Sequence, residues 1–136
     1  MGRYPLYQKN RLLASLPAAD WCRWQNGLDL VDLPLGEVLY ESGIEMEYVY
    51  FPVDAIVSLL YVLEDGGSAE IAVVGNEGVV GVAILMGGGS TTSRAVVQSA
   101  GKSFRMRARI IKEEFGHSEA VLHLMLHYIQ ALSTQM

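Results

Sequence analysis

The feature that most constrains the fold is a succession of short β-rich segments separated by glycine turns, from Leu28 to Met106. β-branched and aromatic residues, which favour strands, concentrate in these segments. Glu64-Asp65-Gly66-Gly67 has the composition of a tight hairpin turn between two of them. Short strands at this spacing are typical of an antiparallel barrel or sandwich. The predicted strands are 28–33, 38–40, 48–51, 55–63, 69–74, 95–98 and 102–107.

Helical patterns flank this β-rich region on both sides. Residues 10–26 predict a helix that is interrupted at Leu16-Pro17, because proline suits a first helical turn. Residues 110–115 predict a short helix, and Ser118 is a suitable N-cap for a longer helix that continues to Met136. A chain of 136 residues is long enough for one domain with one core. We therefore predict a mainly β domain with flanking helices.

The predicted last helix is apolar around roughly two-thirds of its circumference, whereas one core contact needs only about a third to a half. We therefore expect two partners, the chain's own β-domain and a second copy of the chain; the alternative is a helix buried within the monomer. No glycine cap or charged last turn precedes Met136, which predicts that the chain stops inside a helix and is a fragment. The predicted dimer contacts are Val121, Leu124, Met125, Tyr128 and Leu132.

The segment from Glu70 to Val97 is the best candidate for a small-ligand site. Val74-Gly75-Asn76-Glu77-Gly78-Val79-Val80-Gly81 is followed by Gly87-Gly88-Gly89-Ser90-Thr91-Thr92-Ser93-Arg94-Ala95. Glycines let the backbone approach a ligand, and successive amides in such turns form nests for anions. Hydroxyl groups and one guanidinium, which pairs bidentately with phosphate oxygens, complete the pattern. Two interpretations stay open: a small phosphate cradle, or tight turns with a solvated Arg94.

Charge and composition exclude several classes of function. A net charge of -5 makes the chain a poor electrostatic match for nucleic acid. No apolar segment reaches the ~20 residues that span a bilayer, and the N-terminus lacks the apolar core of a secretory signal. Cys22 is the only cysteine, which excludes an internal disulfide, and we expect it to serve packing. We predict a cytoplasmic protein without membrane contact.

Catalytic and metal-binding patterns have little support. Nucleophilic catalysis needs a serine or cysteine beside a base, but histidine occurs only at His117, His123 and His127, near the C-terminal end. His123 and His127 are four residues apart, with Glu119 one turn earlier, which fits either a metal site or a solvated polar stripe. We favour the stripe and predict neither an enzyme nor a bound metal.

A basic cluster lies near the end of the β-rich region. The three arginines at 105, 107 and 109 occupy alternate positions, which predicts one shared face of a strand. Such a face attracts an anion or an acidic partner, or it is simply solvated, and we favour solvation. The cluster consists of Lys102, Arg105, Arg107, Arg109 and Lys112.

Four motifs and a later glycine series carry a family resemblance. The motifs are Leu12-Leu13-Ala14-Ser15-Leu16-Pro17, Leu33-Pro34-Leu35-Gly36-Glu37-Val38-Leu39-Tyr40-Glu41, Gly43 and Val49-Tyr50-Phe51-Pro52. The series that follows in order is Gly75, Gly78, Gly81 and Arg94-Ala95-Val96-Val97. From about Asn10 to Met136 the chain resembles the sensory half of Crp/Fnr-type transcription regulators, within the cyclic-nucleotide-binding domain superfamily.

The resemblance implies an antiparallel β-roll (a double-stranded β-helix, or jelly-roll) of about eight strands. It implies an N-terminal helix before the β-roll and a long dimerisation helix after it. The expected organisation is a sensor domain at 1–117 and the start of the dimerisation helix at 118–136. In complete members a DNA-binding helix-turn-helix domain follows, and this chain lacks it. DNA would therefore be contacted only through that missing domain.

The resemblance also implies a ligand site. In cyclic-nucleotide binders a glycine precedes a glutamate that holds the ribose, and a later arginine, followed by a small residue, neutralises the cyclic phosphate. Gly81 matches the glycine and Arg94-Ala95 the later pair, whereas Val82 stands at the glutamate position and offers no acceptor. Aligning Gly75-Asn76-Glu77 there restores an acid but lengthens the loop to Arg94. The expected ligand-binding residues are Gly81, Val82, Thr92, Ser93, Arg94 and Ala95.

Two functions follow as expectations. The first is the ligand-sensing domain of a Crp/Fnr-type regulator, whose effector is a cyclic nucleotide (cAMP or cGMP) or another small anion. The second is a ligand-free dimerisation and interaction module with a degenerate cyclic-nucleotide pocket, an interpretation that Val82 favours.

Overall fold

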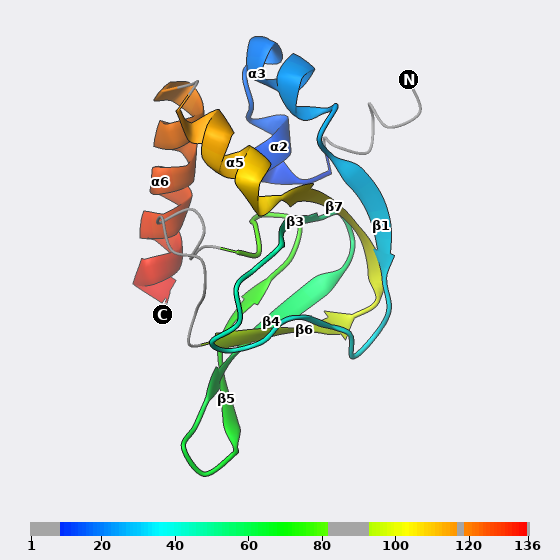
Figure 1. Cartoon of the computed structure of the whole chain (residues 1–136), viewed down its shortest axis with the longest axis vertical. Helices are drawn as coiled ribbons and strands as arrows, with labels where there is room; N and C mark the ends of the chain where they lie inside the picture. The colour runs from blue at the N-terminus through cyan, green and yellow to red at the C-terminus, as the bar shows by residue number, and fades with distance from the viewer. Residues whose placement is uncertain (1–8, 82–92, 117–118, 136) are drawn as a thin grey trace.

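The computed structural model describes residues 9–81, 93–116 and 119–135, and its strands form two antiparallel sheets (Figure 1). The three-stranded sheet has the order β1-β7-β3, with β1 at Asp29–Leu33, β7 at Gly101–Arg107 and β3 at Tyr48–Pro52. The four-stranded sheet has the order β2-β6-β4-β5, with β2 at Val38–Tyr40, β6 at Ser93–Ser99, β4 at Ile56–Val62 and β5 at Ser68–Val74. The mainly antiparallel β fold predicted from the sequence is confirmed.

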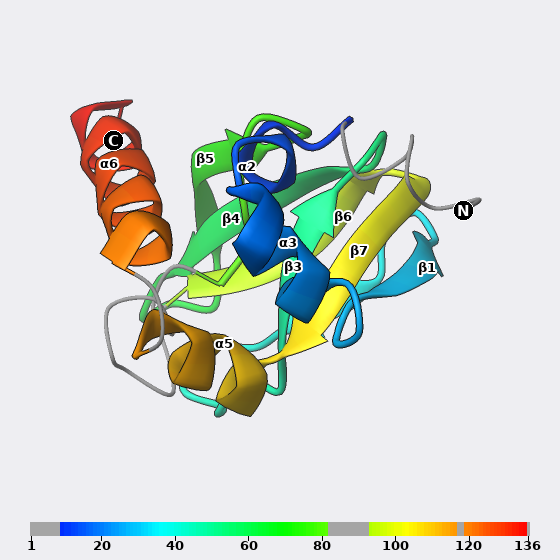
Figure 2. The ribbon, with the colours of Figure 1, turned by 90° about the horizontal axis from the view of Figure 1, so that it is seen from above.

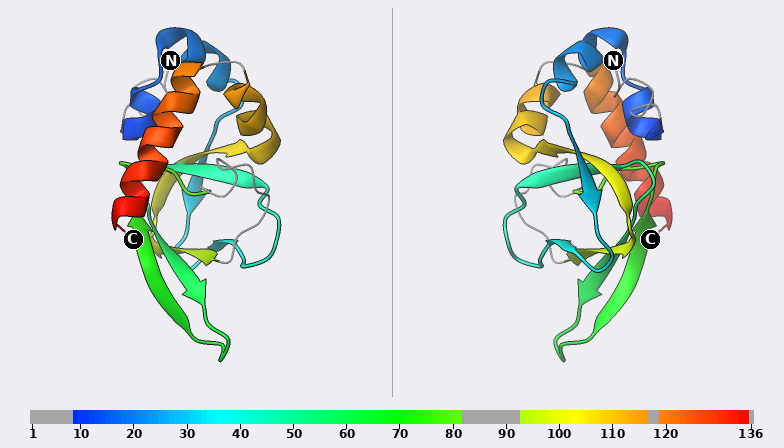
Figure 3. Two further views of the ribbon diagram at one scale, coloured as in Figure 1. Left: turned by 90° about the vertical axis from the view of Figure 1, so that its left-hand side faces the viewer. Right: turned by 90° about the vertical axis from the view of Figure 1, so that its right-hand side faces the viewer.

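Each predicted strand occurs, with ends within two residues of the predicted ones. The hairpin between β4 and β5 projects beyond both sheets (Figures 1 and 3). Its turn needs a glycine, because Gly66 has a φ of 89°. The amide of Leu63 donates to the carbonyl of Gly67 at 2.8 Å and closes the hairpin.

Three helices, α2, α3 and α5, lie over one side of the three-stranded sheet (Figure 2). The predicted N-terminal helix is interrupted as expected, but Pro17 immediately precedes α3 instead of occupying its first turn. Cys22 is exposed, so the packing role predicted for it is wrong. Within the described ranges, no helix has both the length and the apolar character to cross a bilayer. The bounds are α2, Arg11–Ala14; α3, Ala18–Trp24; α5, Ala108–Phe115; and α6, Glu119–Gln135.

The main core lies between these helices and the three-stranded sheet. Alternate residues of β3 and β7 point to this side and are almost completely buried: Val49, Phe51, Phe104 and Met106. The ring of Trp24 from α3 meets the ring of Phe51 edge-on, with centroids 5.9 Å apart. Burial of such side chains contributes about 1.5–3 kcal/mol each before entropy is counted.

Asn10 joins the first helix to the β-sheets. It is fully buried, and its amide nitrogen donates to the carbonyl oxygens of Pro52 and Gly78, both at 2.9 Å. Its side-chain oxygen accepts from the amides of Leu12 and Leu13, both at 3.1 Å, and so caps α2. One side chain therefore serves four backbone groups from three parts of the chain.

The last helix, α6, packs on the chain's own β-domain (Figure 3). Val121 and Met125 are 0% and 1% exposed, and the Tyr128 hydroxyl donates to the carbonyl of Val79 at 3.4 Å. Gly78 lies so close beneath Tyr128 that a side chain there would overlap the ring. This contact explains one glycine of the glycine-rich segment by packing.

The position of α6 corrects part of the predicted dimer interface. Val121 and Met125 cannot meet a second copy, because they already cover the chain's own core. Leu124 and Tyr128 are partly buried against the same core, and the side chain of Leu132 lies outside the described residues. Among the α6 side chains that the structure describes, the exposed large apolar ones are instead Leu122 (36%) and Leu126 (51%).

Candidate functional site

A pocket of about 310 Å³ opens between β2, the connection to β3, and β3 itself. Three of its eight lining residues are tyrosines, so its walls combine aromatic rings with hydroxyl groups. This volume lies at the lower end of the range for small-molecule sites, about 300–1,000 Å³. The lining residues are Leu39, Tyr40, Ile44, Glu45, Met46, Glu47, Tyr48 and Tyr50.

The pairing of β2 with β6 places Tyr40 beside the predicted ligand residues. Tyr40 is the register partner of Ala95, and its hydroxyl is hydrogen-bonded to Ser93. Burial raises the pKa of Tyr40, and the hydrogen bond with Ser93 offsets part of that rise. Ser93 is 8% exposed, so it is buried beside Tyr40 and offers little surface to the solvent.

Arg94 forms an ion pair that the sequence did not indicate. Its Nη2 donates to Oε2 of Glu41 at 2.8 Å, with the two side chains 35% and 48% exposed. Its Nε is buried and has no hydrogen-bond partner among the described residues. Glu41 follows β2 directly, and Arg94 precedes the residue that pairs with the end of β2. The pair therefore depends on strand register, which local sequence does not reveal.

A second arginine lies beside the tyrosines of β3. Arg105 is the register partner of Tyr50 and donates a hydrogen bond to its hydroxyl. Burial raises the pKa of Tyr50, and this bond lowers it by a smaller amount. The Arg105 guanidinium also lies 4.1 Å from the centroid of the Tyr48 ring, a cation–π distance. The ligand residues expected from the sequence do not include Arg105, although its place in the alternating basic cluster is visible there.

 

For two of the predicted ligand residues, Gly81 and Ala95, packing within the β-domain explains the residue type without a ligand. Gly81 has a φ of 121°, and a Cβ there would lie 3.3 Å from Cγ2 of Val49, so the packing of the β-domain itself requires glycine. Ala95 is fully buried opposite Tyr40, which explains its small side chain. Val82 and Thr92 lie outside the described residues. Of the six expected residues, Arg94 therefore offers the clearest polar group for a ligand.

The residues of the predicted alternative, a metal site at Glu119, His123 and His127, all lie on α6. Among the residues that the structure describes, no three His, Cys, Asp or Glu side chains are grouped to hold a metal ion. His123 and His127 are both exposed on α6, as is Glu119. They form the polar stripe that the helical pattern favours.

Comparison with known families identifies the domain. The model of the cyclic nucleotide-binding domain family matches residues 30–117, which is more than half of the chain. The chain belongs to the cyclic nucleotide-binding domain family. The match includes β2, β6 and the Arg94–Glu41 pair, so the site described above lies within the family's domain. No curated protein matches the sequence.

Solved structures share the fold of this cyclic nucleotide-binding domain at low sequence identity. The sensor domain of the transcriptional regulator DNR from Pseudomonas aeruginosa is 16% identical, with a TM-score of 0.72 over 97% of this chain and 91% of that one. The N-terminal domain of a transcriptional regulator from Streptomyces coelicolor is 21% identical, with a TM-score of 0.68 over 93% and 87%.

A third similar structure comes from a different class of protein. It is a mutant regulatory subunit of a cAMP-independent protein kinase A from Trypanosoma brucei, bound to cAMP in the A site. It is 15% identical, with a TM-score of 0.74 over 96% of this chain. This chain spans only 46% of that subunit. The fold thus occurs in regulators of transcription and of kinases.

Proposed function

We propose that this domain is the sensory part of a Crp/Fnr-type transcription regulator and that Arg94 holds a small anionic effector. The observation that carries the proposal is the incomplete bonding of Arg94. Its Nε is buried without a partner among the described residues, and its Nη2 is held by the half-exposed Glu41. An anion with two oxygens, such as a phosphate, can accept from Nε and from one Nη of the same guanidinium at once.

Glu41 gives the proposed site an internal counter-ion. When no effector is bound, its carboxylate neutralises Arg94. Exposed ion pairs of this kind contribute only about 0–1 kcal/mol, so an effector displaces Glu41 at little cost. Binding is then an exchange of one anion for another on the same guanidinium.

The similar regulator structures support a role in transcription over a role in a kinase. This chain spans 91% and 87% of the two regulator fragments, but only 46% of the kinase subunit. We propose that effector binding shifts the equilibrium between two positions of α6. The exposed Leu122 and Leu126 would join α6 to the same helix of a second copy, giving a homodimer.

A ligand-free interaction module is the second candidate. Arg94 already has a carboxylate partner, and valine stands at position 82 where cyclic-nucleotide binders have glutamate. In this case the Arg94–Glu41 pair is structural, and α6 only assembles dimers. The two candidates differ in what happens when Glu41 loses its charge.

The deciding experiment is a thermal-shift and calorimetric titration with cAMP, cGMP and inorganic phosphate. We expect Glu41→Gln to bind an anion more tightly than the wild type, because the competing carboxylate is removed, and Arg94→Gln to bind none at this site. Lys102→Gln, which breaks another exposed pair, is the matched control and leaves binding unchanged. If Glu41→Gln binds all three probes no better than the wild type does, the ligand-free module is the better description.

Light scattering tests the proposed dimer independently. The double variant Leu122→Ala, Leu126→Ala removes two exposed apolar side chains of α6 and leaves the buried Val121 and Met125 unchanged. We expect a dimer for the wild type and a monomer for this variant. A wild-type monomer at high protein concentration would contradict dimerisation through this helix.

A further inference from the structure

Four of the six cationic side chains that form no ion pair among the described residues lie in one segment, and the other two, Lys9 and Arg11, lie at the N-terminal end. Arg23, Arg94 and Lys102 all form ion pairs with carboxylates. The segment 105–112 carries four cations for which the described residues provide no such pair, although the whole chain has a net charge of -5. These four are Arg105, Arg107, Arg109 and Lys112.

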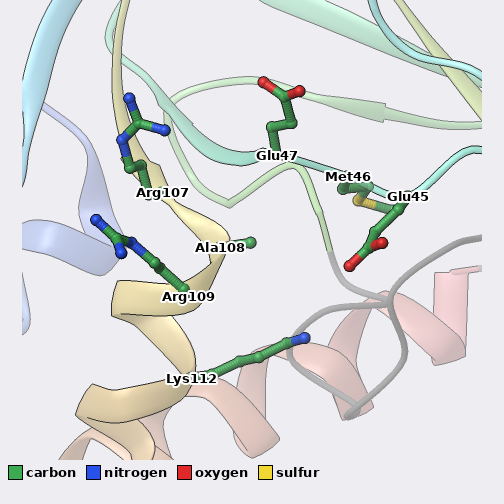
Figure 4. Close-up of a pocket in the computed structure, with 7 residues that line it drawn as sticks. All are labelled: Glu45, Met46, Glu47, Arg107, Ala108, Arg109 and Lys112. Carbon is green, nitrogen blue, oxygen red and sulfur yellow. The ribbon is translucent and has the colours of Figure 1, made fainter.

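Three of these cations line a pocket of about 360 Å³ between the β2–β3 connection and the start of α5 (Figure 4). The amide of Ala108 donates to the carbonyl of Glu47 at 2.8 Å and fixes the two walls against each other. Arg94 and Glu41 do not line this pocket, which adjoins the tyrosine-lined pocket and shares Glu45, Met46 and Glu47 with it. Its lining residues are Glu45, Met46, Glu47, Arg107, Ala108, Arg109 and Lys112.

The structure corrects the predicted arrangement of the arginines. Arg107 ends β7, whereas Arg109 belongs to the first turn of α5, so the two do not share a strand face. They nevertheless extend to the same side of the pocket (Figure 4). Lys112, one turn further along α5, extends towards the opposite side. Because the strand ends at Arg107 and a helix follows, Arg107 and Arg109 lie on the same side of the pocket without being on one strand face.

Two carboxylates also line the pocket and limit what it can bind. Glu45 and Glu47 project away from the two guanidiniums in Figure 4, and neither forms an ion pair with a described cation. Arg107 and Arg109 therefore keep their donors available. The first turn of α5 contains no acidic residue that would compete for them.

We propose that this pocket is a second anion site, which takes the phosphate group of a small monophosphorylated ligand. Two guanidinium forks match the oxygens of one phosphate, and Lys112 adds positive charge on the opposite side of the pocket. Glu45 and Glu47 repel further negative charge, so the remainder of the ligand is neutral or cationic. The pocket thereby selects a monophosphate over a diphosphate.

The test is a two-dimensional NMR titration of the whole chain with inorganic phosphate, with chloride keeping the ionic strength constant. We expect amide shifts at 45–48 and 107–112. Arg107→Gln and Arg109→Gln should each weaken binding by about tenfold, as expected for the loss of a hydrogen bond between charged groups. Arg11→Gln, on the exposed surface of α2, is the matched control and leaves the affinity unchanged.

Selectivity and independence from the Arg94 site complete the test. Pyrophosphate should bind more weakly than phosphate to the wild type, and the double variant Glu45→Gln, Glu47→Gln should lose this preference. Arg94→Gln should leave the shifts at 107–112 intact, so failure of the proposed effector site would not affect this result. Equal shifts with chloride alone, shifts confined to 93–95, or full affinity in both Arg107→Gln and Arg109→Gln would each overturn the proposal.

Discussion

The two faces of the three-stranded sheet differ sharply although the same strands supply both. On the helix side, Val49 and Phe51 of β3 and Phe104 and Met106 of β7 are at most 1% exposed. The other face carries their neighbours in sequence, Tyr48, Tyr50, Arg105 and Arg107. These pair across the strands, Tyr50 with Arg105 and Tyr48 with Arg107, and their tyrosines line the candidate pocket.

In β3 and β7, the residues on one face contribute to the stability of the fold, and the residues on the other face are available for binding. The helix-covered face, with Val49, Phe51, Phe104 and Met106, is called the closed face below. It removes apolar side chains from water, which is the main favourable contribution to folding. The opposite face, with Tyr48, Tyr50, Arg105 and Arg107, is called the open face. It holds hydroxyl and guanidinium groups whose partners include aromatic rings. We therefore expect changes on the closed face to unfold the domain, and changes on the open face to alter charge and binding.

Phe104→Ala should have the largest effect. The ring is fully buried on the closed face, so its removal leaves a cavity and lowers the free energy of unfolding by about 3–5 kcal/mol. Urea denaturation measures the loss. Arg107→Ala, on the open face of the same strand, is the control and should change stability far less. Similar losses in the two variants would contradict the division between the faces.

Asn10→Ala should have the next largest effect, at the point where α2 joins the β-sheets. It leaves the carbonyls of Pro52 and Gly78 without their buried donor and removes the cap of α2. We expect a loss of about 1–3 kcal/mol in the free energy of unfolding. Ser15→Ala, which removes an exposed hydrogen bond to Arg11, is the control. An equally small loss in both variants would show that the buried amide is replaceable.

The closed face could be predicted from sequence, and much of the open face could not. Strand positions follow from local composition and alternation, which is why the bounds agree so closely. The ion pair of Arg94 with Glu41 joins residues 53 positions apart and depends on the register of β2 with β6. For α6, the helical periodicity predicted how much apolar surface must be buried. It did not show that Val121 and Met125 are buried against the chain's own core.

Tyr40→Phe should have a moderate effect that depends on pH. Loss of the hydrogen bond with Ser93 should cost about 0.5–1.5 kcal/mol near neutral pH. Because burial raises the pKa of folded Tyr40 above its ordinary 10.0, the stability linked to its proton is fully present below that value. It is lost as the pH rises through the folded pKa. The phenylalanine variant cannot lose it.

Urea denaturation of the wild type and of Tyr40→Phe on both sides of about pH 10 measures this linkage. The difference in unfolding free energy between the two proteins should shrink as the pH rises. Tyr61→Phe, at an exposed tyrosine of β4, is the matched control and should show a difference that does not vary with pH. A Tyr40→Phe difference that is constant across the range would mean that the hydroxyl is not held in a buried site.

Asp32→Asn should have the smallest effect, and it tests what makes a face closed. Lys102 lies two residues before Phe104 and so follows the same alternation, yet its Nζ bonds Asp32 at 2.9 Å with side chains 48% and 82% exposed. This bond raises the pKa of Lys102. Since water screens such a pair, we expect no resolvable change in urea denaturation. A loss as large as that of Asn10→Ala would mean that this exposed ion pair stabilises the sheet as much as the buried Asn10 amide does.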